Sequence, residues 1–300
     1  MQRRFIYFIN PISGTKGKEA LLSTIKKTTT EKNIPFEILH TNAAGDYTYL
    51  HQKIADENIT DIIICGGDGT VNQIACALTG SNVNIGIIPM GSGNGLAFAA
   101  KIPKQADKAL DVIFNGNAVA IDSFYINKKF SCMLCGIGFD AQVAHDFAKQ
   151  KKRGLATYVK QSTKNFMKAD AYPFTIAVND DTISTEAFFI SIANSNQFGN
   201  NFTIAPRASL YDGLLDIVIV NKMSKLRMLW NVMKQIRKGE VRPYEDKKYQ
   251  RTDIGYFQTE KLIIKNPKKA PLHIDGDPAE TAKEFEIGVI KKAFRLLMPQ

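Results

Sequence analysis

The chain has 300 residues, 44% of them hydrophobic and 23% charged, which is the composition of a globular protein with a sizeable core. Its apolar runs are too short to cross a bilayer, and Phe5–Ile9 is too short for a signal peptide, so we expect a soluble cytoplasmic protein. The net charge of +10 favours an anionic partner: a nucleic acid, a membrane surface or an anionic substrate.

The N-terminal part of the chain alternates strand and helix patterns, which is typical of an α/β domain with a parallel sheet. Strands are predicted at Arg4–Asn10, Phe36–Thr41, Asp61–Cys65 and Asn84–Ile88. The predicted helices cover about Lys18–Lys32, Asp46–Asp56, Thr70–Leu78 and Ala106–Phe114.

Three of these four strands end in polar loops that contain glycine: Asn10–Gly14, Gly66–Asn72 and Gly91–Asn94. Because ligands bind at the carboxyl ends of strands in open α/β sheets, we expect the three loops to converge on one site. The glycines of Gly66–Asn72 let the backbone approach a ligand, and the helix that follows points its N–H groups at an anion. A carboxylate at Asp68, beside a phosphate site, implies a cation between them, namely Mg²⁺.

After about Ile121 the pattern changes to short β-type runs, which favour an antiparallel sandwich or barrel. We place a nucleotide-binding domain at residues 1–121 together with the C-terminal segment 291–300, and a β-sandwich domain at residues 122–290. The strands predicted in the second half are Lys129–Cys135, Phe174–Asn179, Ala187–Ala193, Leu215–Val220, Lys261–Lys265, Phe285–Val289 and Ala293–Met298. Helices are predicted to interrupt them at about Leu155–Lys168 and Lys225–Lys238.

Two glycine and cysteine patterns in this half favour structural roles. Cys132 and Cys135 form a C-x-x-C, but on one strand their side chains point to opposite faces and no further Cys or His completes a metal set. We therefore expect these cysteines, like Cys65 and Cys76, to be structural. The pattern Gly136-x-Gly138-x-x-Ala141 resembles a dinucleotide fingerprint but lacks the acidic residue ~20 positions later. We expect it to form a turn that faces the cleft between the domains.

Two acidic turns also lie in the second half. Asp212-Gly213 precedes a predicted strand, and the segment His273–Pro278, which contains Asp275-Gly276-Asp277, follows one. A simple hairpin turn can explain either of them. A positioned carboxylate can also accept the proton of an acceptor hydroxyl during phosphoryl transfer, so Asp275 and Asp277 are candidate bases.

Taken together, these motifs resemble the diacylglycerol-kinase catalytic-domain family, which includes soluble bacterial lipid kinases and is related to sphingosine kinases. The resemblance covers nearly the whole chain. It implies an NAD-kinase-like α/β domain, a β-sandwich domain, and ATP in a cleft between the two. The segments that carry it are Asn10-Pro11-x-Ser13-Gly14, Gly66-Gly67-Asp68-Gly69-Thr70-x-Asn72, Pro89-x-Gly91-Ser92-Gly93-Asn94, Gly136-x-Gly138-Phe139-Asp140-Ala141, Asp212-Gly213 and Asp275-Gly276-Asp277.

The family's functional residues can be carried over to matching positions. The resemblance implies that Asp212, with the carbonyls of Ser209 and Leu214, holds a structural Mg²⁺. It implies that Asp68 belongs to a Mg²⁺–water network and joins Asp275 and Asp277 in the catalytic set. The nucleotide would be bound by Asn10, Pro11, Ser13, Gly14, Thr41, Gly66, Gly67, Asp68, Gly69, Thr70, Asn72, Ser92 and Asn94.

Two positions depart from the family pattern. Soluble bacterial diacylglycerol kinases usually have Asp where this chain has Gly95, so one carboxylate of the Mg²⁺ network is missing. The loop Gly91–Ala97 is closer to that of sphingosine kinases. The catalytic turn usually reads Asp-Gly-Glu, whereas Asp277 is one methylene shorter, which leaves Asp275 as an alternative base.

We therefore predict an ATP- and Mg²⁺-dependent lipid kinase that transfers the γ-phosphoryl group to a lipid hydroxyl. Diacylglycerol is the first candidate acceptor, giving phosphatidic acid, and a sphingoid base or phosphatidylglycerol stays open. An NAD kinase shares Gly-Gly-Asp-Gly-Thr, but the Gly-Ser-Gly-Asn loop speaks against it. A non-catalytic nucleotide- or lipid-binding protein is a further alternative, because Gly95 and Asp277 alter the acidic network.

The basic charge fits a lipid substrate at a membrane surface. Apolar residues recur at helical spacing within 224–238 among several Lys and Arg, so this helix either packs on the sandwich or binds anionic headgroups. We expect peripheral contact with the inner face of the membrane. Nucleic acid is not expected as a partner, because no aromatic recognition motif accompanies the basic runs. A homodimer is left open.

Overall fold

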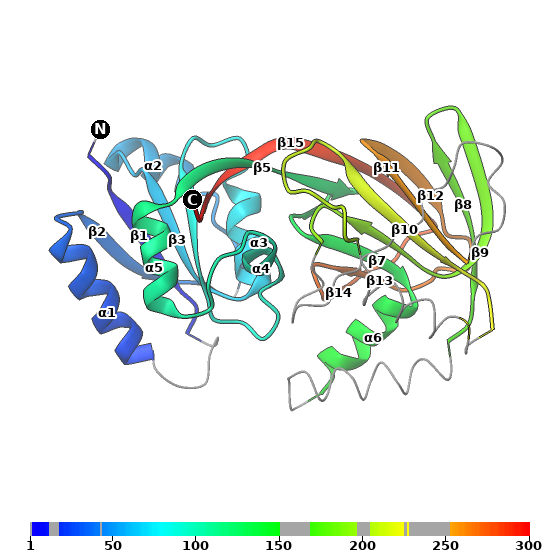
Figure 1. Cartoon of the computed structure of the whole chain (residues 1–300), viewed down its shortest axis with the longest axis horizontal. Coiled ribbons are helices and arrows are strands. Elements are labelled where there is room, and N and C mark those ends of the chain that lie inside the picture. Colours follow the sequence, from blue (N-terminus) through cyan, green and yellow to red (C-terminus); the bar gives the residue numbers. More distant parts are fainter. Residues whose placement is uncertain are drawn as a thin grey trace. The chain divides into compact units, whose positions relative to one another are not determined.

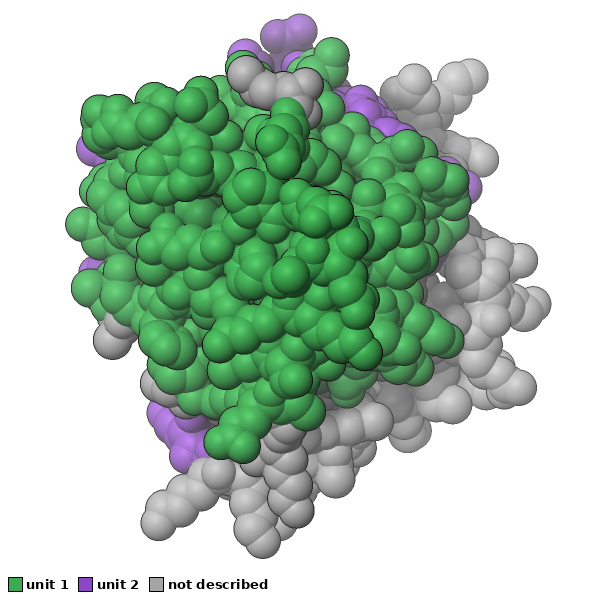
Figure 2. Space-filling view, turned by 90° about the vertical axis from the view of Figure 1, so that its left-hand side faces the viewer, with its two compact units in different colours: residues 1–122, 291–300 green, residues 123–290 purple. Residues whose placement is uncertain are grey.

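The computed structural model describes residues 2–11, 18–42, 44–150, 169–196, 205–224, 227 and 253–300. These residues form two compact units, coloured separately in Figure 2. Unit 1 comprises residues 1–122 and 291–300, and unit 2 comprises residues 123–290. The sequence places the domain boundary one residue earlier. The helices predicted at Leu155–Lys168 and Lys225–Lys238 lie outside the described residues, apart from Arg227.

Unit 1 is an α/β domain built on a parallel sheet with strand order β2-β1-β3-β4-β15 (Figure 1). The central strands are buried on both faces, which explains why β1 and β3 are continuous apolar runs instead of alternating ones. In chain order its elements are β1 (Phe5–Ile9), α1 (Lys18–Glu31), β2 (Phe36–His40), α2 (Leu50–Glu57), β3 (Asp61–Gly66), α3 (Asp68–Ala77), β4 (Asn84–Pro89), α4 (Gly95–Ala99) and α5 (Ala106–Asn115).

Two helices of unit 1, α2 and α4, differ most from the prediction. α2 begins at Leu50 and not near Asp46, because the Asp46 carboxylate accepts hydrogen bonds from the N–H (2.9 Å) and hydroxyl (2.7 Å) of Thr48 and holds a turn. The short helix α4 was not predicted. It starts after Asn94, a left-handed residue (φ +54°), and its five residues are too few to show a helical period.

Unit 2 is a β-sandwich whose strand pairs are all antiparallel among the described residues. Its main core lies against the inner face of the sheet and includes Ile137, Ile190, Ile217 and Phe285. Its elements are β5 (Asn117–Ile126), β6 (Lys129–Ser131), β7 (Leu134–Gly138), α6 (Phe139–Ala148), β8 (Tyr172–Val178), β9 (Asp181–Ala193), β10 (Leu215–Asn221), β11 (Ile254–Thr259), β12 (Lys261–Lys265), β13 (Leu272–Ile274), β14 (Asp277–Ala279) and β15 (Glu284–Met298). The boundary between the units falls inside β5 and β15.

The predicted strand Lys129–Cys135 is two strands, β6 and β7. The chain leaves the ladder at Cys132 and Met133 because their N–H groups are bonded to the Asp275 carboxylate. Cys132 and Cys135 are therefore not on one strand, although both are buried as expected. Burial raises the pKa of Cys65 to about 12 and raises that of Cys135 well above its usual value, whereas Cys76 is only half-buried.

The last two predicted strands are one strand, β15. It pairs with β12 in unit 2, and its residues Arg295 and Leu296 pair with β4 in unit 1. Lys291 and Lys292 lie between the two predicted strands. The strand continues through them because the buried Asp122 carboxylate accepts the N–H of the left-handed Lys292 (2.7 Å, φ +53°). β5, β11 and β14 were not predicted either, and β13 was predicted only as a strand of unstated bounds before the acidic turn.

Candidate active site

The carboxyl ends of the unit 1 strands lie side by side, as predicted. The N–H of Asn10, after β1, donates to the Cys65 carbonyl at the end of β3 (3.0 Å). The N–H of Met90, after β4, donates to the Gly66 carbonyl (2.9 Å), and the N–H of Thr41, after β2, donates to the Ile9 carbonyl (3.1 Å). The ends of all four strands are thus tied to one another by the backbone alone.

Two of the loops touch through glycines. A Cβ on Gly91 would come within 2.7 Å of the Gly67 Cα, and a Cβ on Gly67 would come within 3.0 Å of the Gly91 Cα. Gly93 lies just as close to the Asp68 side chain, since a Cβ there would stand 2.8 Å from Oδ2. The loops can approach this closely only because these three positions have no side chain.

Helix α3 points its N-terminus into this cluster. It begins at Asp68, two residues earlier than predicted, with Gly67 as an extended N-cap. Its first N–H groups have no partner within the helix, which makes the end suitable for an anion such as a phosphate. The side chain of Asn10 donates to the Thr70 hydroxyl (2.8 Å), so the loop after β1 is fastened to the first turn of α3.

The loop after β4 is closed by Asn94. Its amide accepts a hydrogen bond from the Gly91 N–H and donates to the Gly91 carbonyl, both at 2.8 Å, and the side chain is buried. Ser92 is exposed at the tip of this loop, and Pro11 is exposed after β1. Asn94 therefore shapes the loop, whereas Ser92 is open to a ligand. Ser13 and Gly14 lie outside the described residues.

The acidic turn of unit 2 joins β13 to β14 as a two-residue hairpin. Asp275 and Gly276 both have positive φ (+49° and +86°), as the type I′ turn of a tight hairpin requires. Asp275 is buried and Asp277 is exposed. The two candidate bases therefore stand in different surroundings although only one residue separates them.

The Asp275 carboxylate is held by the segment between β6 and β7. It accepts hydrogen bonds from the Ser131 hydroxyl (2.6 Å) and from the N–H groups of Cys132 (3.1 Å), Met133 (3.1 Å) and Leu134 (3.0 Å). A buried charge needs such partners, and these bonds fix the turn to β7. Asp275 thus anchors the hairpin, and Asp277 is the carboxylate that it presents to solvent.

Two residues that sequence reasoning missed lie beneath this turn. His273 is fully buried, and its Nε2 lies 3.4 Å from Oδ2 of Asp140, in the first turn of α6. Asp140 belongs to the glycine motif that was predicted to form a turn, whereas the structure ends β7 at Gly138 and begins α6 at Phe139. The start of α6 could have been predicted from the acidic residue that follows the strand, because acidic residues are typical of the first turn of a helix.

Asp212 lies in an exposed turn before β10. Its carboxylate accepts the Leu214 N–H (3.1 Å), and Gly213 is left-handed (φ +76°). A carboxylate together with the carbonyl oxygens of Ser209 and Leu214 is a set of hard oxygen donors that suits Mg²⁺. Within the described residues no group of three or more His, Cys, Asp or Glu side chains could hold a metal ion, so such a site would depend on main-chain carbonyls.

Each unit matches a known protein family. The model of the "Diacylglycerol kinase catalytic domain" matches residues 4–126, and that of the "YegS C-terminal NAD kinase beta sandwich-like domain" matches residues 134–293. The chain belongs to the diacylglycerol kinase family of lipid kinases. Membership in a kinase family implies ATP as the phosphoryl donor.

Relatives of this lipid kinase span most of its length. The "Probable lipid kinase YegS-like" of Citrobacter koseri is 30% identical over 261 residues, covering 83% of this chain and 82% of the relative. The "Diacylglycerol kinase" of Staphylococcus carnosus is 24% identical over 281 residues, covering 92% and 89%. A solved structure of a diacylglycerol kinase from Bacillus anthracis str. Sterne has the same fold, with a TM-score of 0.73 and 18% identity over 99% of this chain and 97% of that one.

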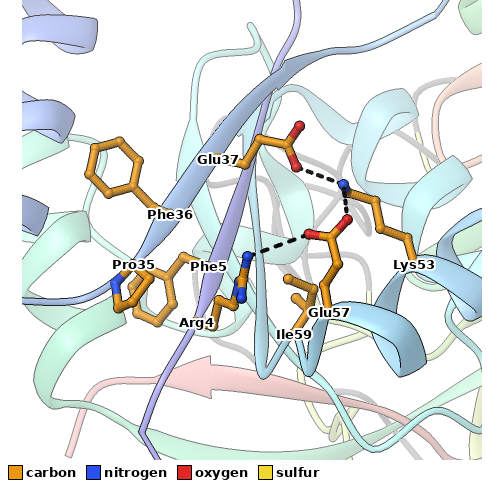
Figure 3. Close-up of a pocket in the computed structure, with 8 residues that line it drawn as sticks. All are labelled: Arg4, Phe5, Pro35, Phe36, Glu37, Lys53, Glu57 and Ile59. Carbon is orange, nitrogen blue, oxygen red and sulfur yellow. Dashed lines mark hydrogen bonds and ion pairs between the residues drawn. The ribbon is translucent and has the colours of Figure 1, made fainter.

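The lipid kinase also has a hollow of about 350 Å³ in unit 1 (Figure 3). Its lining includes the first residues of β1 and β2, so it lies at the opposite end of the strands from the glycine loops. Lys53 pairs with Glu37 (2.8 Å) and Glu57 (2.6 Å), and Arg4 lies 3.7 Å from Glu57. These charges neutralise one another, which gives the hollow no net preference for the phosphates of ATP.

Among the described residues, no helix is both long enough and apolar enough to cross a membrane. The predicted basic helix at Lys225–Lys238 falls outside those residues, so contact with a lipid surface stays a prediction.

Proposed function

We propose that this lipid kinase phosphorylates diacylglycerol with Mg²⁺·ATP and releases phosphatidic acid and ADP. The observation that carries the proposal is the glycine contact of Gly67 with Gly91 at the N-terminus of α3. It supports a donor site in which main-chain N–H groups, unobstructed by side chains, meet the phosphates. A sphingoid base or phosphatidylglycerol is the next candidate acceptor.

Each residue has a defined part in this proposal. The N–H groups at the start of α3 bind the phosphates, and the exposed Ser92 hydroxyl adds a donor. Asp68 would hold the Mg²⁺ of the nucleotide, and Asp212 with two carbonyls would hold a structural one. Bound Mg²⁺ would neutralise the charge that develops on the phosphoryl oxygens.

Asp277 is proposed as the general base that takes the proton of the lipid hydroxyl. Its exposed carboxylate supports this role, whereas the carboxylate of Asp275 is engaged by four donors from residues 131–134. Most of the catalysis would come from positioning and charge stabilisation, as is usual in phosphoryl transfer.

The test is transfer of radiolabelled phosphate from ATP to a panel of diacylglycerol, sphingosine, phosphatidylglycerol and NAD. We expect labelled phosphatidic acid from the wild type, and loss of label with Asp68→Ala. Label on NAD alone would make the protein an NAD kinase. ATP binding without transfer to any acceptor would make it a non-catalytic nucleotide-binding protein.

Peripheral membrane contact is part of the same proposal, because diacylglycerol resides in a bilayer. The net charge of +10 supports an electrostatic contribution. Binding to vesicles should increase with the fraction of anionic lipid and decrease with salt. Binding that does not respond to salt would exclude the electrostatic part.

A further inference from the structure

A buried Asp–His pair lies directly under the acidic hairpin of unit 2. His273, on β13, is paired with Gly136 on β7, and its ring is fully buried. Its Nε2 lies 3.4 Å from Oδ2 of Asp140, whose side chain is 8% exposed. Figure 1 shows α6, which carries Asp140, beside β13 and β14. Two ionisable side chains, one from β13 and one from α6, are thus buried together next to the turn.

The other nitrogen of His273 reaches the turn itself. The N–H of Gly276, at the centre of Asp275-Gly276-Asp277, donates to Nδ1 of His273 (3.3 Å). An acceptor nitrogen cannot carry a proton, so Nδ1 is bare and the proton of the neutral ring is on Nε2. Nε2 and Oδ2 of Asp140 do not make a hydrogen bond in this structure, but at 3.4 Å the negative carboxylate still favours a proton over a lone pair on the nitrogen next to it.

Asp140 is itself fixed in place. Its Oδ1 accepts the Ala141 N–H (2.8 Å), and the negative charge lies in the first turn of α6, where the helix dipole is favourable. Helix α6 is bound to β13 a second time, because Nε2 of His145 lies 2.7 Å from the Leu272 carbonyl. The position of the Asp140 carboxylate is therefore set by α6 and not by the imidazole, so the carboxylate can determine how the imidazole is oriented.

Gly136 provides the space for the pair. A Cβ at this position would lie 1.9 Å from Oδ2 of Asp140 and 2.4 Å from Nε2 of His273. Neither buried group could keep its place beside a side chain there. This explains a glycine that the sequence pattern associated with a dinucleotide fingerprint.

We propose that Asp140 and His273 are positioning residues that hold the catalytic turn by fixing the His273 tautomer. Asp275 anchors the start of the turn to residues 131–134, and Nδ1 of His273 binds the N–H at its centre. These two contacts together determine the position of Asp277. This role rests on the proposed function, in which Asp277 is the base.

Three variants distinguish the role of Nδ1 of His273 from that of Nε2. The side-chain amide of His273→Asn can place its oxygen where Nδ1 stands, and that of His273→Gln reaches the position of Nε2. Asp140→Asn turns Oδ2 or Oδ1 into an N–H donor. At Oδ2 it favours a bare Nε2, which leaves the proton on Nδ1 facing the Gly276 N–H.

The first measurement is ¹⁵N NMR of the full chain with labelled histidine, which assigns the tautomer without any turnover. We expect a proton on Nε2 of His273 and none on Nδ1, and we expect Asp140→Asn to move the proton to Nδ1. A wild-type ring protonated on Nδ1 would overturn the proposal, whether or not any lipid is phosphorylated. A failure of the proposed function alone would leave this NMR result intact.

The second measurement is steady-state kinetics with Mg²⁺·ATP and the lipid that the panel identifies. We expect kcat to fall by up to about 10-fold in Asp140→Asn and His273→Gln, the worth of one hydrogen bond, with KM for ATP unchanged. His273→Asn, which keeps an acceptor for Gly276, should recover most of kcat. Equal losses in both His273 variants, or a matching rise in KM for ATP, would overturn the positioning role.

Discussion

The glycine loops of unit 1 and the acidic hairpin of unit 2 are built on opposite principles. In unit 1, the close approach of Gly67 to Gly91 depends on side chains being absent, and the groups aimed at the ligand belong to the main chain. In unit 2, the turn is supported by buried polar side chains, Asp275 and His273, that bond to main-chain N–H groups. The glycine loops depend on the space that missing side chains leave, whereas the acidic hairpin depends on hydrogen bonds from main-chain N–H groups to buried polar side chains.

This difference decided what could be predicted from the sequence. A glycine-rich loop after an apolar strand is a local signal, so the meeting of the three loops at the carboxyl ends of β1, β3 and β4 was predicted from short segments. The hydrogen bonds of Asp275 span more than 140 positions of the chain, and no local pattern announces them. The same contacts divided the predicted strand Lys129–Cys135. Some antiparallel pairs of unit 2, such as those of β7 with β9 and of β7 with β13, likewise join segments that lie far apart in the sequence.

Among the variants considered, Asp277→Asn should reduce activity the most. Removing a general base typically costs about 10²–10⁴-fold in rate, so kcat should fall by that order while thermal stability is retained, because Asp277 is exposed. Glu280→Gln, which also neutralises an exposed acid nearby, is the matched control and should keep full activity. Unchanged kcat in Asp277→Asn would show that the base lies elsewhere.

Asp275→Asn should act on stability first. An amide at this buried position puts a donor against the N–H groups of residues 132–134, and the lost charge-assisted bonds should cost about 3 kcal/mol of the free energy of unfolding. Urea denaturation of this variant beside Asp277→Asn measures the contrast. Wild-type stability with abolished transfer would instead assign the base to Asp275.

Gly91→Ala tests the claim that unit 1 depends on space. The added Cβ would lie 2.7 Å from the Gly67 Cα, a main-chain atom that cannot rotate away, so the loops must separate at a cost of about 1–3 kcal/mol. ATP affinity measured by calorimetry should fall by roughly 5- to 150-fold. Gly288→Ala, with nothing within 4 Å of its Cβ, is the control. Wild-type affinity in Gly91→Ala would refute the close contact.

The smallest effect is expected from the hydrogen bond between Asn10 and Thr70. Thr70→Val removes the hydroxyl that accepts from Asn10 (2.8 Å), while Thr70→Ser keeps it. The difference between the two variants in KM for ATP should be about 2- to 10-fold, the net worth of one hydrogen bond. A similar difference in an Asn10→Ala background would show that the two side chains act independently.

The single strand β15 has a consequence for how the protein is made. Arg295 and Leu296 lie against β4, and the Ala293 carbonyl accepts the Gly80 N–H (2.8 Å), so the last residues belong to the same sheet as the first. During synthesis, all of residues 123–290 are added to the chain before residues 291–300, which complete the sheet of unit 1. Unit 1 therefore stays without one of its strands throughout that interval, although domains generally fold N-terminal first during synthesis. Its assembly is finished after that of the sandwich, and a nascent chain stalled before residue 291 should remain unable to retain ATP.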